Sequence, residues 1–205
     1  MDEDDEEQSQ NSIKVILVGD SGTGKTNLIG VATGQPFNPE SFTTINCSYI
    51  QFKININETE YKVNLWDTMG QEKYKSITKI FFKNAKIVLF VYDVTQRETF
   101  NSLTNWKKII DDILGNVHLI AVVANKCDLY LKEQVKEEEG KKYAEEIGAK
   151  FIYTSAKNDA KNFRAFLEEI VKEYVIKYGI KNEKEIKINK KKLNQSGNNQ
   201  KRKCC

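Results

Sequence analysis

The sequence predicts an α/β fold: a mostly parallel six-stranded sheet with one antiparallel edge strand and helices on both faces. Three observations lead to this prediction. Short apolar runs typical of buried strands alternate along the chain with stretches of helical periodicity. Two of the runs are joined by a short polar turn, which is typical of an antiparallel hairpin. The alternation of the other strands with helices favours parallel strands that are covered on both faces.

The first half of the chain supplies four of the expected strands and one helix. Strands are expected at residues 13–18, 48–56, 61–66 and 87–92, and a helix at residues 27–33. The tripeptide Gly34-Gln35-Pro36 ends this helix, because neither glycine nor proline favours a continued helix. Apolar and polar side chains alternate in the second strand, and a turn at residues 57–60 leads back into the third.

The second half of the chain alternates helices and strands. Helices are expected at residues 99–114, 135–147 and 163–178, and strands at residues 119–124 and 151–154. Gly115, Gly148 and Gly179 end the three helices, since glycine readily adopts the left-handed angles of a helix end. Ligands of such sheets bind beyond the carboxyl ends of the strands, so residues that follow a strand are the candidates for function.

The 205 residues allow one domain with a sizeable core and two polar tails. We expect an acidic, disordered tail at residues 1–11, the folded domain at residues 12–179 and a flexible basic tail at residues 180–205. From Lys177 onward the chain carries ten Lys or Arg and two Glu. Four cysteines without a framework spacing indicate a reducing compartment, and the acidic start argues against a signal peptide. No apolar run is long enough to predict a membrane span.

The octapeptide after the first strand, Gly-Asp-Ser-Gly-Thr-Gly-Lys-Thr, fits the phosphate-binding pattern G-x-x-x-x-G-K-[ST]. Its glycines let backbone N–H groups wrap an anion, and the helix that begins near Lys25 adds its positive end. Lys25 is a point charge for the β- and γ-phosphates, and the Thr26 hydroxyl suits Mg²⁺. The predicted phosphate-binding residues are Gly19, Asp20, Ser21, Gly22, Thr23, Gly24, Lys25, Thr26 and Asn27. ATP-using folds carry this loop too, so it does not choose the base.

The string Asn125-Lys126-Cys127-Asp128, after a buried strand, points to guanine. The Asp128 carboxylate can accept two hydrogen bonds from a ring N–H and an exocyclic amine, a pair that guanine offers and adenine does not. Asn125 can hold neighbouring loops together, and the Lys126 stem can lie over the face of the base.

A second base-facing segment, Ser155-Ala156-Lys157, follows the next strand, so its backbone N–H groups can meet the guanine carbonyl. Phe37, in the loop after the first helix, is the expected cover of the base. Two such segments after consecutive strands, in a chain with a phosphate loop, predict a guanine nucleotide site.

The loop that begins at Asp67 and the loop around Thr44 supply the remaining chemistry. Asp67 ends a strand and can hold Mg²⁺, while Thr44 is a candidate second hydroxyl ligand. The backbone N–H of Gly70 can reach a γ-phosphate, because no side chain blocks it. Gln71 carries a donor and an acceptor and can position water for in-line attack, so Gln71 and Lys25 are the expected catalytic residues.

With these motifs the chain resembles Ras-superfamily small GTPases, and among them the Rab family, from about residue 13 to residue 178. The similarity to Rabs lies in residues 61–66, 73–78, 81–85 and 90–95, in Ser21 and in the terminal Cys204-Cys205 pair. The resemblance implies a P-loop NTPase small G domain. The family's roles carry over to Lys25, Thr26, Thr44, Asp67, Gly70, Gln71, Asn125, Lys126, Asp128, Ala156 and Lys157.

The resemblance implies a GTP/GDP switch in vesicle and membrane trafficking that hydrolyses GTP with Mg²⁺. Its implied partners are an exchange factor, an activating protein, a GDP-dissociation inhibitor or escort protein, and effectors that bind the GTP form. Cys204 and Cys205 resemble a double-geranylgeranylation signal, which implies attachment to the cytoplasmic face of endomembranes and cycling with the cytosol. We expect a monomer that binds no nucleic acid.

The arginines of the chain predict slow intrinsic hydrolysis. Arg97, Arg164 and Arg202 are its three arginines, and none lies in the phosphate loop or in the loops of Thr44 and Gln71. In Ras-type enzymes, the group that this chain resembles, an arginine finger raises the rate by roughly 10³–10⁵-fold. A partner protein is therefore expected to supply this charge.

The chain departs from the family pattern at three positions. Met69 stands where these families usually have Ala, before the Gly of the second loop. Asn46 stands where Rabs have Gly, and it tolerates left-handed backbone angles. Ser41 replaces an aromatic residue that is common over the nucleotide, although Phe42 is adjacent.

Two other functions stay open at this point. The first is a membrane scaffold that binds GTP and barely hydrolyses it, because the long Met69 side chain would stand beside Mg²⁺ and the γ-phosphate. Single-turnover hydrolysis with an activating protein separates this function from a switch. The second is a metabolic nucleoside kinase, which would need a lid and a second substrate site, and the sequence shows neither.

Overall fold

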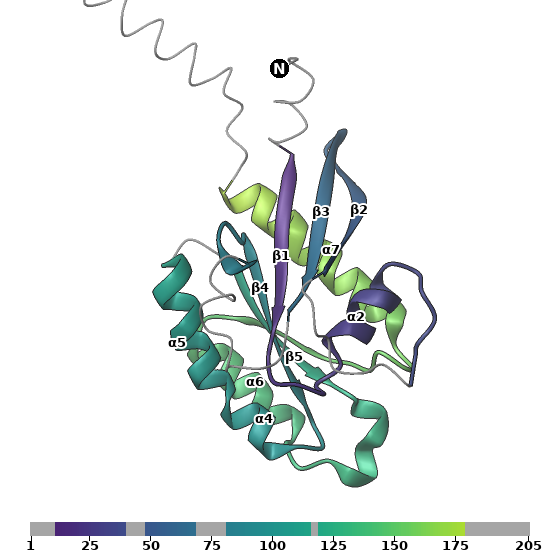
Figure 1. Cartoon of the computed structure of the whole chain (residues 1–205), viewed down its shortest axis with the longest axis vertical. Coiled ribbons are helices and arrows are strands. Elements are labelled where there is room, and N and C mark those ends of the chain that lie inside the picture. The colour runs from purple at the N-terminus through teal and green to yellow at the C-terminus, as the bar shows by residue number, and fades with distance from the viewer. Residues whose placement is uncertain (1–10, 40–47, 69–80, 116–118, 179–205) are drawn as a thin grey trace, which may run out of the picture.

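The structure is a computed structural model that describes residues 11–39, 48–68, 81–115 and 119–178 (Figure 1). In chain order its elements are β1 (Ser12–Val18), α2 (Lys25–Ala32), β2 (Ser48–Ile56), β3 (Thr59–Asp67), β4 (Ile87–Asp93), α4 (Arg97–Asn101), α5 (Leu103–Leu114), β5 (Leu119–Asn125), η2 (Cys127–Lys132), α6 (Glu137–Glu146), β6 (Lys150–Tyr153) and α7 (Ala160–Tyr178). Of the two predicted tails, at residues 1–11 and 180–205, only Asn11 lies within the described residues.

One sheet of six strands, in the order β2-β3-β1-β4-β5-β6, runs through the domain. The edge strand β2 is antiparallel to β3, and the other neighbouring pairs are parallel. The predicted α/β class with one antiparallel edge strand is therefore confirmed. In the register of β4 and β5, Asp93 lies opposite Asn125, so two polar residues sit side by side where both strands end.

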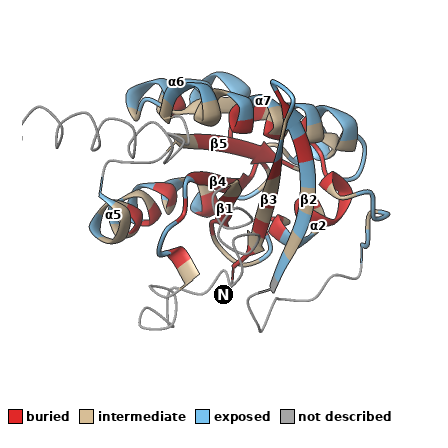
Figure 2. Cartoon of the chain, turned by 90° about the horizontal axis from the view of Figure 1, so that it is seen from above, coloured by how far each residue is buried: buried red, intermediate tan, exposed pale blue. Residues whose placement is uncertain are grey.

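Two hydrophobic layers cover the two faces of the sheet, because successive side chains of a strand point to opposite sides. Ile13, Val15 and Leu17 of β1 belong to one layer, which also contains buried residues of α2 and α7. Ile16 and Val18 belong to the other, together with buried residues of α5 and α6. Figure 2 shows the buried residues on the strands and on the inward sides of the helices.

The β2–β3 hairpin has a tighter turn than the predicted four residues. β3 begins at Thr59, and Asn57 and Glu58 have φ angles of 49° and 65°. Two successive residues with positive φ form the type of two-residue turn that matches the twist of a hairpin. Glu58 is not a residue that favours this conformation, which is why the sequence suggested a longer turn.

The predicted helix 99–114 is divided at Ser102 into α4 and α5. The Ser102 hydroxyl donates a 3.0 Å hydrogen bond to the Thr99 carbonyl, so it competes with the backbone for that acceptor. The 3₁₀ segment η2 was not predicted, because its residues have no regular apolar spacing. Within the described part of the chain, no helix has the length and apolar character needed to cross a bilayer.

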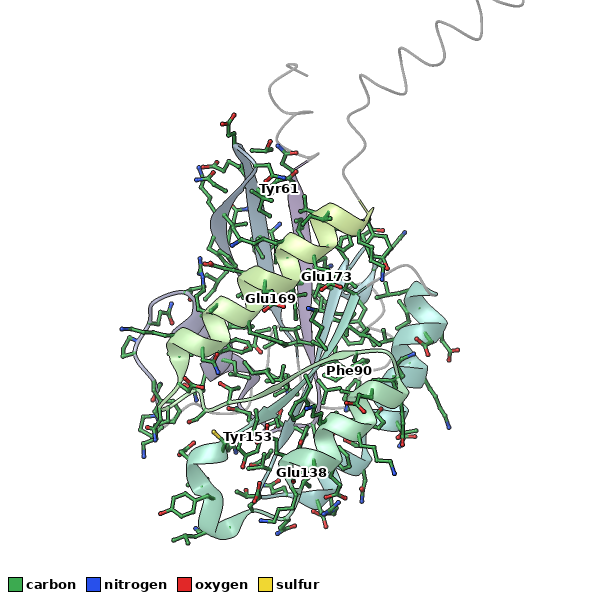
Figure 3. The ribbon with its side chains drawn as sticks, turned by 180° about the vertical axis from the view of Figure 1, so that it is seen from behind. Tyr61, Phe90, Glu138, Tyr153, Glu169 and Glu173 are labelled. Atoms are coloured by element: carbon green, nitrogen blue, oxygen red, sulfur yellow. The ribbon has the colours of Figure 1, made fainter. Side chains whose placement is uncertain are left out.

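The edge strand β6 is fastened to helix α7 by charged side chains. The Lys150 ammonium lies 2.9 Å from a Glu169 oxygen and 2.8 Å from a Glu173 oxygen. Glu169 and Glu173 stand on successive turns of α7 (Figure 3). At the other end of β6, the Tyr153 hydroxyl donates a 2.7 Å hydrogen bond to Glu133, just beyond η2. These contacts fix the strand that precedes the predicted Ser155-Ala156-Lys157 segment.

Candidate nucleotide-binding site

The carboxyl ends of the five parallel strands lie at one edge of the sheet (Figure 1). The predicted phosphate loop follows β1, and Asp67 ends β3. Asn125 ends β5, and Ser155 comes shortly after β6. Because parallel strands share this edge, residues far apart in the sequence are brought together as the topology predicts.

Two glycines let the phosphate loop pass close to its neighbours. Gly19 has a φ of 150°, and a Cβ atom there would lie 2.1 Å from the Val91 carbonyl oxygen. Gly24 has a φ of 92°, and a Cβ atom would lie 2.4 Å from Nδ2 of Asn125. Neither position has room for a larger residue, so the pattern's glycines serve both the loop's shape and its contact with the Asn125 loop.

Lys25 is a buried cation inside this loop. Its Nζ atom donates 2.8 Å hydrogen bonds to the carbonyl oxygens of Gly19 and Asp20. Burial lowers the pKa of Lys25 from 10.5 to about 8, although the nearby Asp67 and Asp20 charges act in the opposite direction. An anionic ligand beside Lys25 would stabilise its charged form, which suits a phosphate-binding role.

The predicted metal ligands Thr26 and Asp67 are in direct contact. Thr26 stands in the first turn of α2, and its hydroxyl donates a 2.7 Å hydrogen bond to Oδ2 of Asp67. A hydroxyl and a carboxylate oxygen are hard donors of the kind that Mg²⁺ prefers, so this pair fits the predicted ion. In the described ranges no group of three or more His, Cys, Asp or Glu side chains is placed so that it could hold a metal ion. The third predicted ligand, Thr44, lies outside those ranges.

The buried Asn125 side chain joins three loops. Its Nδ2 atom donates a 2.8 Å hydrogen bond to the Thr23 carbonyl in the phosphate loop. Its Oδ1 atom accepts a 3.1 Å hydrogen bond from the Ala156 backbone N–H, beyond β6. The phosphate loop and both predicted base-facing segments are thus held in one fixed arrangement.

Asp128 is oriented by the second base-facing segment. The Ser155 hydroxyl donates a 2.5 Å hydrogen bond to Oδ1 of Asp128. The same Ser155 oxygen accepts hydrogen bonds of 3.1 Å from the backbone N–H groups of Lys157 and Asn158. The carboxylate predicted to read guanine therefore sits beside the residues predicted to meet the guanine carbonyl.

Lys126 reaches from the base-facing loop to the phosphate loop. Its ammonium donates a 2.6 Å hydrogen bond to the Gly22 carbonyl and lies 2.6 Å from Oδ2 of Asp93. The residue itself has a left-handed φ of 67°. Asp93 was not among the predicted site residues. The signal that could have found it is its place directly at the carboxyl end of β4.

A second contact that the sequence did not reveal ties α5 to the phosphate loop. The indole Nε1 of Trp106 donates a 2.8 Å hydrogen bond to Oδ1 of Asp20. Helical periodicity marks Trp106 as a core residue, and its side chain is indeed buried. Periodicity says nothing about the polar edge of the ring, so this contact could not be predicted.

The other predicted residues are placed as follows. The Asn27 side chain donates and accepts 3.0 Å hydrogen bonds with the backbone of Asn38. Phe37 is half-buried and packs against the hydrophobic layer of α2 and α7, and its contact with a base stays a prediction. The predictions that lie outside the described residues concern Thr44, Gly70, Gln71, Cys204 and Cys205.

An aromatic patch made by Tyr49 of β2 and Trp66 of β3 lies next to Asp67, which ends β3 at the site. The sequence predicted only the hairpin at this place. Tyr49, 55% exposed, lies opposite Trp66 in the hairpin, with 5.0 Å between the stacked rings. The ring centroids of Phe81 and Trp66 are 6.1 Å apart. The Lys14 ammonium lies 4.2 Å from the centroid of the Trp66 ring. Tyr49 is the exposed member of this group, whereas Trp66 and Phe81 are partly buried and pack against the hydrophobic layer of α5 and α6. The alternation of β2 could have shown Tyr49 on the face opposite the core.

A loop with the phosphate-binding pattern, the Asp128 carboxylate that is predicted to read the base, and the Thr26–Asp67 pair lie at one sheet edge, the arrangement expected of a nucleotide-binding domain of the P-loop class. The Ras family model matches residues 14–176. The mouse Ras-related protein Rab-21 is 35% identical over 157 residues, which cover 77% of this chain and 71% of the relative. Rab-2B of Dictyostelium discoideum is 37% identical over 166 residues, which cover 80% and 82%.

A third relative aligns along nearly the whole chain. The Ras-related protein SEC4 of Saccharomyces cerevisiae is 35% identical over 206 aligned positions, which cover 97% of this chain and 94% of the relative. The chain therefore belongs to the Ras family, in its Rab group, and is a small GTPase.

Proposed function

We propose that this chain is a GTP/GDP switch of vesicle and membrane trafficking. The observation that carries the proposal is the double hydrogen bonding of Asn125. One atom of its amide bonds Thr23 in the phosphate loop and the other bonds Ala156 beside the base-reading carboxylate. Phosphate and base sites joined in this way suit one nucleotide rather than separate small anions. The Rab-named relatives support a trafficking role.

The described residues would bind the nucleotide at both ends. Asp128 and the backbone N–H groups beyond β6 would meet guanine, while Lys25 and the phosphate loop would neutralise the phosphates. Thr26 and Asp67, together with Thr44, would hold Mg²⁺. The bound ion would supply positive charge that stabilises the negative oxygens of the transferring phosphoryl group.

Switching follows from the predicted roles of the two loops. Thr44 and the Gly70 backbone would hold their loops only while a γ-phosphate is present, and Gln71 would orient the attacking water. Hydrolysis would remove both anchors, so partners could distinguish the two states. The aromatic patch of Tyr49 and Trp66 lies on the strands that lead out of the Thr44 loop and into Asp67, where effectors could read the change.

Two arginines are engaged by partners that do not belong to the predicted phosphate loop, which supports slow intrinsic hydrolysis. Arg97 pairs with Glu139, and a guanidinium nitrogen also bonds the Gln134 carbonyl. Arg164 pairs with Glu168 and lies 3.9 Å above the Phe52 ring. An activating protein would therefore supply the missing charge. An exchange factor and a dissociation inhibitor or escort protein would complete the cycle on the cytoplasmic face of endomembranes.

The test is single-turnover hydrolysis of GTP by the purified full chain, with and without a Rab-activating protein. The switch predicts slow release of phosphate that the activating protein accelerates. GDP should remain bound afterwards, and ADP should not displace it. GTP bound through the assay without hydrolysis, even with the activating protein, would instead support the locked scaffold.

A further inference from the structure

We propose that Asp93 is a positioning residue for the nucleotide: its buried carboxylate holds the Lys126 ammonium and so fixes the side chain that lies over the base. The inference rests on the proposed function, because it concerns Lys126 as part of a guanine nucleotide site. We do not expect the Asp93 side chain to contact the nucleotide itself. It acts through Lys126, from the end of the central strand β4.

The burial of Asp93 makes the charge of Lys126 necessary. Asp93 is 1% exposed and stands between two fully buried residues, Tyr92 and Val94. A carboxylate removed from water to this degree is costly unless hydrogen bonds or an opposite charge compensate it. Its position in the register, opposite Asn125, places it beside the backbone from which Lys126 extends.

The two carboxylate oxygens of Asp93 have different roles. Oδ1 accepts hydrogen bonds from the Thr95 backbone N–H at 2.8 Å and from the Thr95 hydroxyl at 2.7 Å. These bonds fix the orientation of the carboxylate. Oδ2 accepts no hydrogen bond of standard geometry from the described residues, and the Lys126 ammonium lies 2.6 Å from it. The contact at Oδ2 is therefore chiefly a charge interaction.

Lys126 gains a defined position from this contact. An ammonium on a flexible four-carbon stem has no preferred direction of its own. Here it is held between Oδ2 of Asp93 and the Gly22 carbonyl, both at 2.6 Å. The side chain keeps 30% of its surface exposed, so a base can lie against the stem. The pair also supports the left-handed backbone of Lys126, which is uncommon for a residue other than glycine.

Other hydrogen bonds of this region hold the β4 and β5 loops together without the Asp93 side chain, and an Asn at position 93 keeps the Oδ1 acceptor of the Thr95 backbone N–H. The Val94 N–H donates a 3.1 Å hydrogen bond to the Asn125 carbonyl, and Asn125 is held by its own side chain. Asp93 can therefore be changed to an amide of the same shape without removing the links between the loops. An effect of Asp93→Asn on the nucleotide would therefore indicate a positioning role of the Asp93 charge rather than a loss of loop structure.

The experiment measures dissociation of a fluorescent GDP analogue from the full chain in Mg²⁺. Asp93→Asn should accelerate dissociation on the order of tenfold, the loss expected for one charge-assisted contact. Thr95→Val is the matched control, because it removes the hydroxyl that bonds Oδ1, keeps the backbone N–H bond that orients the carboxylate, and leaves the charge facing Lys126. Its dissociation rate should stay near that of the unaltered chain. Equal acceleration by both variants would overturn the inference in favour of a structural role.

A double variant tests whether Asp93 acts through Lys126. If it does, adding Asp93→Asn to Lys126→Met should cause no further acceleration, and additive effects would contradict the inference. Thermal unfolding gives a second test that does not need the single Asp93 variant to fold. Lys126→Met alone leaves a buried charge uncompensated, so the double variant should unfold at a higher temperature than Lys126→Met.

The outcomes also separate this inference from the proposed function. An unaltered chain that binds no guanine nucleotide would contradict the function itself. An unaltered chain that binds GDP, with Asp93→Asn releasing it at the same rate, would contradict only the role of Asp93.

Discussion

The indole N–H of Trp106 and the carboxylate of Asp20 are joined by a 2.8 Å hydrogen bond that links helix α5 to the phosphate loop. The two residues lie on different elements, and the bond crosses from the buried layer under α5 to the rim of the site. Asp20 is thus held by its side chain, while its backbone carbonyl accepts bonds from Lys25 and Thr23. The geometry of the phosphate loop at Asp20 is therefore coupled to the packing of Trp106 in the hydrophobic layer under α5.

Trp106→Phe should loosen the phosphate loop, because it keeps an aromatic ring but removes the N–H donor. A hydrogen bond to a charged group contributes about 1.5–3 kcal/mol, so we expect a lower unfolding temperature and faster GDP release. Calorimetry and nucleotide-release kinetics check this. Asp20→Asn is the matched control, since its amide oxygen can still accept the bond. If it releases GDP as fast as Trp106→Phe, the loop depends on the Asp20 charge rather than on the bond.

Asp128→Ala should weaken GDP binding on the order of 10²-fold or more, because two charge-assisted hydrogen bonds to guanine would be lost, each of roughly 1.5–3 kcal/mol. ADP binding should not improve. Calorimetric titration with both nucleotides measures this, and unchanged GDP affinity would refute the assignment. Ser155→Ala is informative beside it: the variant keeps the carboxylate but loses the 2.5 Å bond that orients it, so its effect should be smaller.

Arg97→Gln should leave intrinsic GTP hydrolysis unchanged, because Arg97 is engaged with Glu139, which is not part of the predicted nucleotide site. Stability near neutral pH should fall by less than about 1 kcal/mol, since the pair is exposed and screened by solvent. The hydrogen bond from Arg97 lowers the pKa of Glu139 below its ordinary 4.5. The pair therefore stabilises the fold above the unfolded-state pKa, and this contribution is lost as pH falls through the lowered folded-state pKa. Denaturant unfolding at pH 7 and pH 3 should show the two chains converging in acid.

The strands and the functional motifs that follow them could be predicted because both depend on local sequence patterns. Apolar runs, a phosphate-loop string and a base-reading string are all contiguous, and parallel topology alone gathers their ends at one edge. The position of Asp93 at the end of β4 could have marked it as a candidate, but its contact with Lys126 and the contact of Trp106 with Asp20 could not be predicted, because each joins atoms from distant parts of the chain. At Ser102, where the predicted helix is divided, a side-chain hydrogen bond to the Thr99 carbonyl forms that apolar spacing does not encode.

Gln71→Leu should leave nucleotide binding nearly unchanged and slow intrinsic hydrolysis, because the variant keeps much of the volume but cannot orient water. Intrinsic hydrolysis is the cleaner assay, since activators of Rabs can bring their own Gln as well as an Arg. A rate equal to that of the unaltered chain, measured without activator, would exclude this role. Met69→Ala is the companion variant: faster hydrolysis there would show that Met69 restrains the site.

Cys204→Ser together with Cys205→Ser should release the protein from membranes and leave GTP binding intact. Basic residues at an anionic surface contribute about 1 kcal/mol each when close to it, and salt screens them. The lysines of the tail are spread out, and the acidic run at residues 2–7 is repelled by the same surface. A buried lipid contributes roughly 0.8 kcal/mol per CH₂, and one modest chain anchors only marginally. Two prenyl chains should therefore dominate and resist salt.

Membrane pelleting from cells at low and high salt measures this prediction. Either single Cys→Ser change should leave a weaker anchor and partial mislocalisation, since one prenyl chain remains. The control is the GTP affinity of the double variant, which should match that of the unaltered chain because the tail takes no part in the predicted nucleotide site. A double variant that still pelleted fully at high salt would show that lipids on Cys204 and Cys205 are not the anchor. A double variant that pelleted at low salt and was released only at high salt would assign the attachment to the basic residues instead.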